Sequence, residues 1–175
     1  TGKEELLSEL AFERARLEFC YTRQRRQLGL GHVVLTARPF VGQQSFVVAL
    51  GDSIIGIHAQ STIVKRMVET FGTHSADAVI AFEEVPRHEV KQYGIAKPRG
   101  DATDTFVLAD IIEKPSVDEA PSNLAVAARY VFSPMIFELL ASTHPGKGGE
   151  IQLTDAIRTW IHRGGKVLGM KLNRQ

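Results

Sequence analysis

The chain has 175 residues, of which 43% are hydrophobic and 23% are charged, a composition typical of one globular domain with a substantial core. Its 21 Lys and Arg residues nearly balance 20 Asp and Glu residues, so no net field favours nucleic acid or a membrane surface as a partner. No apolar run approaches the roughly 20 residues that a transmembrane helix needs, and the first residues do not resemble a signal peptide.

Two elements are expected before the first glycine-rich loop. Residues 3–16 place leucines at helical spacing between charged residues, which predicts an amphipathic helix. Residues 17–22 are predicted to form a short strand that buries Cys20. A single cysteine cannot form an internal disulfide, so we expect a reduced thiol in a cytosolic protein.

The loop of residues 24–31 carries Gly29 and Gly31 directly before an apolar periodic segment, which predicts a helix from about residue 33. Glycines ahead of a helix allow backbone N–H groups to approach an anionic ligand closely. The spacing matches neither a Walker loop nor a dinucleotide fingerprint. The arginines around Gln24 have no neighbouring aromatic stripe, so we interpret them as part of a solvated loop and not as a nucleic-acid surface.

The segment around which the chain is organised is the apolar run at residues 46–50. It predicts a central strand that is buried on both faces and ends at Gly51. Ligands of open α/β sheets bind beyond the carboxyl ends of the strands, so Asp52 would stand where chemistry is done. Its carboxylate suits a divalent cation beside phosphates. The alternative is that Asp52 only caps the following turn or helix.

A helix, a strand and an extended segment follow this run. Residues 61–71 predict a serine-capped amphipathic helix, and residues 77–85 predict the next strand. A helix between two strands is the pattern of a mostly parallel sheet. Residues 90–98 are extended around Gly94, a glycine that indicates either a bulge or the close approach of another group to the backbone.

The strand predicted at residues 105–112 ends in Glu113, Lys114 and a proline. An acid and a base at a strand terminus can form an exposed edge. They can equally form a site in which the glutamate accepts hydrogen bonds from sugar hydroxyls and the lysine holds a phosphate. The residues alone favour the exposed edge.

Four elements are predicted in the last third of the chain. They are a strand at 124–132, a short helix from Pro134 to residue 142, an amphipathic helix at 150–163, and a strand at 166–172. The last strand is followed by no further element, which leads us to expect a chain cut from a longer one.

Several of these segments together resemble one enzyme family. The segments are residues 24–41, Leu-Gly-Asp-Ser-Ile at 50–54, Tyr-Gly-Ile at 93–95, Glu-Lys-Pro at 113–115, residues 120–132, and Gly-Gly-Glu-Ile-Gln-Leu-Thr-Asp-Ala-Ile at 148–157. In collinear order they resemble bacterial UTP:glucose 1-phosphate uridylyltransferases, which are sugar nucleotidyltransferases. The resemblance covers essentially the whole chain.

This resemblance implies a fold, a reaction and a set of partners. The implied fold is a Rossmann-like α/β nucleotidyltransferase fold with a mostly parallel central sheet flanked by helices. The implied reaction makes UDP-glucose and pyrophosphate from UTP and glucose 1-phosphate with Mg²⁺, and the attack on the α-phosphorus depends mostly on positioning and charge neutralisation. The resemblance further implies a cytoplasmic enzyme that forms homo-oligomers at full length and has no nucleic-acid or membrane partner.

The resemblance also assigns the nucleotide and metal residues. Asp52 matches the metal-binding acid, while Gln24 and Gly29 match residues that read the uracil base. Ser53 stands where these enzymes usually carry a second acid and where related enzymes carry an asparagine. Its hydroxyl can contact a sugar but adds no charge at the metal, so the choice of sugar stays open.

The sugar phosphate residues follow in the same way. Gly94 and Glu113 match contacts to sugar hydroxyls, and Lys114 matches the lysine that grips the sugar phosphate. By this resemblance Lys114 and Asp52 are the two catalytic residues whose loss should reduce activity most.

The chain also departs from the family at both ends, so we expect a single domain, residues 1–175, that is incomplete relative to it. The family's first strand and phosphate loop lie upstream of anything like Thr1, and its second metal acid lies downstream of Gln175. We expect the 175-residue chain alone to be inactive because half of the groups around the α-phosphorus are missing. The alternatives are a related enzyme for another sugar or nucleotide, and a short paralogue that binds nucleotide sugars without catalysis.

Overall fold

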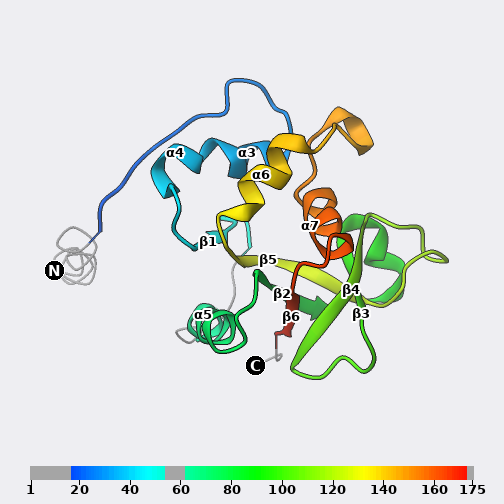
Figure 1. Ribbon diagram of the computed structural model, residues 1–175. Helices are drawn as coiled ribbons and strands as arrows, with labels where there is room; N and C mark the ends of the chain where they lie inside the picture. The colour runs from blue at the N-terminus through cyan, green and yellow to red at the C-terminus, as the bar shows by residue number, and fades with distance from the viewer. Residues whose placement is uncertain (1–16, 54–61, 173–175) are drawn as a thin grey trace, which may run out of the picture.

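The computed structural model describes residues 17–53 and 62–172 (Figure 1). The helix expected at residues 3–16 and the serine expected to cap the helix at residues 61–71 lie outside the described residues.

The described strands form one six-stranded sheet in the order β1-β5-β2-β6-β4-β3. Their bounds are Phe46–Ala49 for β1, Ala78–Glu84 for β2, Gly94–Pro98 for β3, Thr105–Glu113 for β4, Leu124–Phe132 for β5 and Val167–Lys171 for β6. The predicted strands at residues 46–50, 77–85, 105–112, 124–132 and 166–172 are therefore confirmed. Four of the five are rich in β-branched or aromatic residues, which fit a pleated, half-buried surface, whereas β6 is mostly apolar with Val167 as its one β-branched residue.

The sheet is mixed, so the expectation of a mostly parallel sheet is wrong. Among the described strands only β2 and β6 pair in parallel, whereas β5 runs antiparallel to both β1 and β2. β1 and β2 do point the same way, as strand-helix-strand units require. They are not neighbours, however, because β5 enters the sheet between them from much later in the chain. Order along the sequence does not show such an insertion.

Helices cover both faces of this sheet (Figure 1). The cluster on one face includes side chains of α3 (Leu30–Thr36), α6 (Met135–Ser142) and α7 (Leu153–His162), and that on the other includes α5 (Ile63–Thr73). The remaining helical segments are α4 (Arg38–Val41) and the short 3₁₀ helices η1 (Arg87–Gln92) and η2 (Lys147–Gly149). None of the helices in the described part of the chain could span a membrane. The predicted α/β architecture with flanking helices is confirmed.

The core follows from the two-residue period of the strands. In β2, Ile80 and Phe82 face the cluster that contains α6 and α7, and Val79 and Ala81 face the cluster that contains α5. All four side chains are fully buried. Successive side chains of a strand point to opposite faces, so a strand that is apolar throughout belongs between two layers of helices.

The edge strand β1 is less buried than we expected. Its side chains alternate between half-buried and exposed, and Val47 is 40% exposed. The expectation of a strand buried on both faces is therefore wrong in the described structure. β1 stands at the end of the described sheet, with β5 as its partner on one side.

Residues 17–22 do not form the predicted strand. This segment has no regular secondary structure, and Leu17, Phe19 and Tyr21 are 52%, 59% and 88% exposed. Cys20 is also exposed, so the predicted buried thiol is wrong. A short apolar stretch forms a strand only if the fold supplies a strand to pair with it. None of the described strands pairs with residues 17–22.

Replacement of Phe132 by Ala should lower the free energy of unfolding by about 3–5 kcal/mol, because a fully buried ring would leave a cavity. Its ring lies within 6.5 Å, centroid to centroid, of the rings of Phe46, Tyr130 and Trp160. Urea unfolding measures the change. Phe40→Ala is the matched control, because Phe40 is 55% exposed and should cost less than about 1 kcal/mol. Equal losses for the two variants would contradict the described core.

Candidate active site

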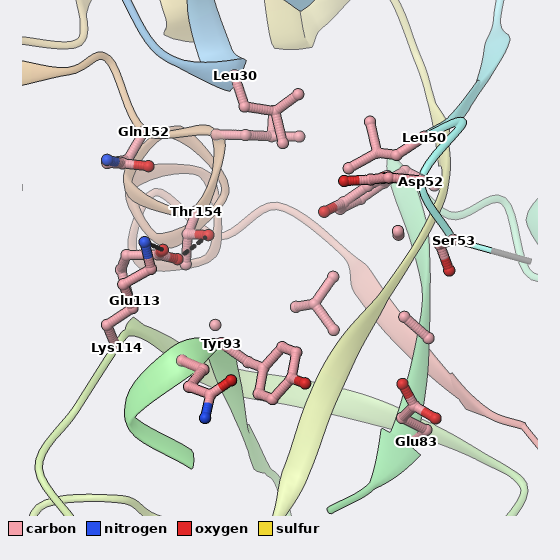
Figure 2. Close-up of a pocket in the computed structure, with 17 residues that line it drawn as sticks. Leu30, Leu50, Asp52, Ser53, Glu83, Tyr93, Glu113, Lys114, Gln152 and Thr154 are labelled. Atoms are coloured by element: carbon pink, nitrogen blue, oxygen red, sulfur yellow. Dashed lines mark hydrogen bonds and ion pairs between the residues drawn. The ribbon is translucent and has the colours of Figure 1, made fainter. Parts of the chain in front are cut away.

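A pocket of about 550 Å³ lies where the ends of β1, β2 and β4 and the start of β3 meet the first turn of α7 (Figure 2). It brings together five residues singled out from the sequence: Asp52, Ser53, Gly94, Glu113 and Lys114. In the view of Figure 2 the turn with Asp52 and Ser53 lies at one side, and Glu113 and Lys114 lie at the other.

The turn that carries Asp52 is held by β5. The backbone N–H of Leu50 donates to the carbonyl of Ala128 at 3.2 Å. The Arg129 guanidinium donates to the carbonyl of Leu50 at 3.1 Å and to that of Ser53 at 2.7 Å. These bonds bracket Asp52, whose own carboxylate is exposed and makes no hydrogen bond or ion pair to the described residues. The carboxylate is thus positioned by its backbone and is available to a ligand.

A bulge in β5 places Arg129 for this task. Ile80 of β2 pairs with Tyr130 and Phe82 pairs with Val126, so a single β2 residue faces three residues of β5. Ala128 in the middle has a φ of 53°, which is strained for a residue with a Cβ. Bulges commonly re-aim side chains next to active sites, and this one lines the pocket.

Glu113 lies at the opposite wall, at the end of β4. It pairs with Gly94 of β3, and its side chain is only 15% exposed. The Thr154 hydroxyl donates to Oε2 of Glu113 at 2.7 Å, and the Lys114 ammonium lies 3.9 Å from Oε1. Because β3 covers this end of β4, the exposed-edge interpretation is wrong for Glu113.

Gly94 has no side chain, which allows the side chains of this pocket wall to pack against its backbone. A Cβ at this position would lie 3.2 Å from both Glu113 Oε2 and Thr154 Oγ1, and 3.3 Å from Val126 Cγ2. Contacts this short are tighter than ordinary van der Waals packing. Of the two interpretations of this glycine, close approach of other groups to the backbone is therefore confirmed.

Lys114 combines an anchored backbone with a half-exposed side chain. Its φ is 45°, in the left-handed region that costs an L-residue about 1–2 kcal/mol. Its N–H donates to the Tyr93 carbonyl at 2.9 Å, while its side chain is 46% exposed and lines the pocket. Strained backbone of this kind gathers at functional sites, and the observation supports a functional role for Lys114.

Tyr130 lines the pocket from β5 and is 5% exposed. Burial, and to a smaller extent the negative charge of Glu113, raise the pKa of its phenol well above the ordinary value near 10. The phenol therefore stays neutral at physiological pH.

Gln24 and Gly29 lie together on the loop before α3 and not in the lining of the pocket. The Gln24 amide donates to the Gly29 carbonyl at 3.2 Å and lies 2.8 Å from Nδ1 of His32. The neighbouring Leu30 does line the pocket, so this loop borders it. The assignment of Gln24 and Gly29 to a uracil base stays a prediction.

The side chains that line the pocket fit Mg²⁺ as a ligand shared with substrate phosphate. Mg²⁺ in phosphate-transfer sites commonly takes one or two carboxylates and fills its other positions with water and substrate phosphate. Asp52 offers such a carboxylate at the pocket. Within residues 17–53 and 62–172 no group of three or more His, Cys, Asp or Glu side chains gathers into a cage of its own. Asp52 as a metal ligand therefore stays a prediction.

The residues at or beside the pocket that were not singled out from the sequence include Arg129, Tyr130 and Thr154. A signal existed for Arg129, because a charged residue within an apolar strand is rare unless it has partners. Thr154 looks like an ordinary polar residue near a helix start, and its contact with Glu113 spans 41 positions of the chain. Only the folded chain shows that contact.

Residues 2–175 match the family model described as nucleotidyl transferase. The chain belongs to this family. A UTP–glucose-1-phosphate uridylyltransferase from Pseudomonas aeruginosa is 42% identical over 139 residues, which are 79% of this chain and 50% of that protein. One from Staphylococcus saprophyticus is 39% identical over 156 residues, 89% of this chain and 53% of that protein. The chain thus spans about half the length of the curated relatives it matches.

Solved structures give the same relationship. A UDP-glucose pyrophosphorylase complexed with UDP-glucose superposes with a TM-score of 0.92 at 34% identity, over 100% of this chain and 66% of that chain. A UTP-bound enzyme of this name from Acinetobacter baumannii gives a TM-score of 0.79 at 33% identity, over 99% and 61%. The resemblance found in the sequence, and with it the nucleotidyltransferase fold, is confirmed.

Proposed function

We propose that the full-length protein joins UTP and glucose 1-phosphate to form UDP-glucose and pyrophosphate. The observation that carries this proposal is the pocket, which joins an exposed carboxylate at Asp52 to an acid and base pair at Glu113 and Lys114 across the open ends of the sheet. Membership in the nucleotidyl transferase family and the names of the relatives support the choice of reaction.

The pocket offers separate groups for the two parts of a sugar phosphate. Glu113 accepts hydrogen bonds from sugar hydroxyls through the carboxylate oxygen that is not bonded to Thr154, and Gly94 lines the same wall without a side chain that would crowd it. Lys114 holds the phosphate and orients its oxygen toward the α-phosphorus of UTP. In this proposal the loop of Gln24 and Gly29 reads the uracil base at the border of the pocket.

Charge supports Mg²⁺ as the cofactor. The described lining carries three carboxylates, those of Asp52, Glu83 and Glu113, against the single ammonium of Lys114. Phosphates would be repelled by this lining unless a cation accompanied them. In this proposal Asp52 holds Mg²⁺, which neutralises charge on the phosphate oxygens when bound. The nucleotide and sugar phosphate substrates favour a cytoplasmic enzyme, and assembly into homo-oligomers remains part of the proposal.

The proposal is tested with the purified full-length protein. Pyrophosphate release is followed with UTP and glucose 1-phosphate, with and without Mg²⁺, and with a chelator as control. We expect UDP-glucose to form only when both substrates and the metal are present. If the protein bound UDP-glucose but released no pyrophosphate, this result would contradict the proposed enzymatic activity and favour a non-catalytic binding module.

A second candidate substrate class is other sugar 1-phosphates, because Ser53 lines the pocket where the resemblance leads us to expect a second acid. The same assay with galactose, mannose and glucosamine 1-phosphates, and with dTTP in place of UTP, separates the candidates. A kcat/KM for another pair above that for UTP and glucose 1-phosphate would replace the proposed reaction by the related one.

A further inference from the structure

Thr154 is joined to Glu113 by a direct side-chain hydrogen bond across the pocket wall. The threonine lies in the first turn of α7, and its Oγ1 donates to Oε2 of the carboxylate at 2.7 Å. The bond is partly buried, and both residues line the pocket (Figure 2). A hydrogen bond to a charged acceptor is stronger and more directional than a neutral one.

The surroundings leave the Glu113 carboxylate little freedom. Its side chain is 15% exposed, and Gly94 backs it so closely that one added methyl group would crowd both Oε2 and the Thr154 hydroxyl. Thr154 therefore occupies Oε2 and leaves Oε1, which forms an ion pair with the Lys114 ammonium at 3.9 Å, as the oxygen that carries no hydrogen bond from the threonine. The threonine hydroxyl donates the hydrogen bond to Oε2, so it restrains the orientation of the carboxylate.

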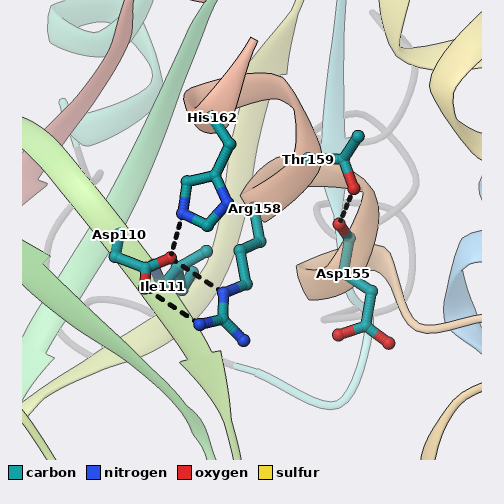
Figure 3. Close-up of polar contacts among 6 residues, drawn as sticks. All are labelled: Asp110, Ile111, Asp155, Arg158, Thr159 and His162. Atoms are coloured by element: carbon teal, nitrogen blue, oxygen red, sulfur yellow. Dashed lines mark hydrogen bonds and ion pairs between the residues drawn. The ribbon is translucent and has the colours of Figure 1, made fainter.

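The position of α7 does not depend on this bond. Farther along the helix, Arg158 forms two hydrogen bonds to the Asp110 carboxylate of β4, at 3.0 and 3.1 Å, and His162 lies 3.3 Å from the same carboxylate (Figure 3). The apolar face of α7 is buried in the core at Leu153, Ile157 and Trp160. Loss of the Thr154 hydroxyl should thus change the carboxylate and leave the helix in place.

We propose that Thr154 is a positioning residue that sets sugar selectivity by orienting the Glu113 carboxylate. This inference rests on the proposed function, because it assumes that Glu113 receives the sugar hydroxyls. A carboxylate held in one orientation accepts hydrogen bonds from hydroxyls of one configuration, whereas a freely rotating carboxylate accepts them from several. Specificity built on such hydrogen bonds is lost when the acceptor is no longer aimed.

The test compares Thr154→Val, which keeps the shape but removes the hydroxyl, with Thr154→Ser, which keeps the hydroxyl, in the full-length protein. With the valine variant we expect kcat/KM for glucose 1-phosphate to fall about tenfold or more, mainly through KM. The kcat/KM values for galactose and mannose 1-phosphate should fall less than about threefold. The preference of the enzyme for glucose 1-phosphate over these two sugars should therefore decrease. The serine variant should stay within about threefold of wild type. KM for UTP should not change.

Two controls separate positioning from structure. Thr159→Val removes a hydroxyl that donates to the Asp155 carbonyl on the same helix but outside the pocket, and it should leave all constants unchanged. In a Glu113→Ala background, Thr154→Val should add less than about a twofold further loss, because the residue it acts through is gone.

Each contrary result is distinct. Two results would overturn the positioning role of Thr154 without contradicting the proposed reaction. One is an equal fall in kcat/KM of Thr154→Val for all sugar 1-phosphates, and the other is a fall in the Glu113→Ala background as large as in the wild-type background. Wild-type kinetics in the valine variant would do the same. If the wild-type protein formed no nucleotide sugar from any substrate, the proposed function would fall and the inference with it.

Discussion

Replacement of Asp52 by Asn in the full-length protein is expected to lower kcat by about 10²- to 10⁴-fold without changing the free energy of unfolding. A carboxylate that binds the metal contributes several kcal/mol to the stabilisation of transition-state charge, and an amide of the same shape cannot neutralise the cation. The turn itself is held by Arg129 through the carbonyls of Leu50 and Ser53, so the substitution removes charge and leaves the backbone anchored.

The measurement is steady-state turnover over a range of Mg²⁺ concentrations, together with urea unfolding of both proteins. Asp118→Asn is the matched control, because Asp118 is also an exposed carboxylate in a turn and does not line the pocket. It should leave kcat and the metal dependence unchanged. Wild-type turnover of Asp52→Asn at saturating Mg²⁺ would remove Asp52 from the metal site and return it to the role of a turn residue.

The elements that could be predicted from the sequence are those whose apolar pattern is long and regular. β2, β5 and α7 each carry such a pattern, and each lies close to its expected position. The pattern fails where pairing partners decide the outcome. Residues 17–22 have apolar character but no described strand beside them. β5 inserts between β1 and β2 from far along the chain, as the pairing of Phe46 with Phe132 shows. Local propensity carries no information about such distant partners.

Among the residues of the candidate site, too, those with a local sequence signal differ from those whose role depends on distant partners. Asp52 could be singled out because it follows an apolar strand, and strand ends are where open sheets bind ligands. Glu113 was singled out only by the family resemblance, because its own residues favoured an exposed edge. Arg129 anchors the turn around Asp52, and Thr154 donates a hydrogen bond to Glu113, each from an element that is far away in the chain. The sequence hints that Arg129 has partners, since a charged residue within an apolar strand is rare without them, but only the fold shows which residues Arg129 and Thr154 contact.

Replacement of Lys114 by Ala should weaken glucose 1-phosphate binding and slow the chemical step together, because the attacking phosphate oxygen would be neither held nor oriented. Loss of one charge-assisted contact to phosphate corresponds to about 1.5–3 kcal/mol, or roughly ten- to a hundred-fold in affinity. Binding of UTP should change much less. Initial rates measured with each substrate varied in turn give the two Michaelis constants and kcat.

Two further variants serve as a control and as a test of whether the charge of Lys114 is sufficient. Lys91→Ala removes an exposed ammonium outside the pocket and should leave both Michaelis constants unchanged. Lys114→Arg keeps the charge on a longer, planar group, so partial recovery of glucose 1-phosphate binding with a low kcat would indicate that the phosphate oxygen must be aimed as well as neutralised. If Lys114→Ala left kcat and the Michaelis constant for glucose 1-phosphate unaltered, Lys114 would be a solvent-facing residue. The assignment of Glu113, which the same resemblance supplied, would then lose its support.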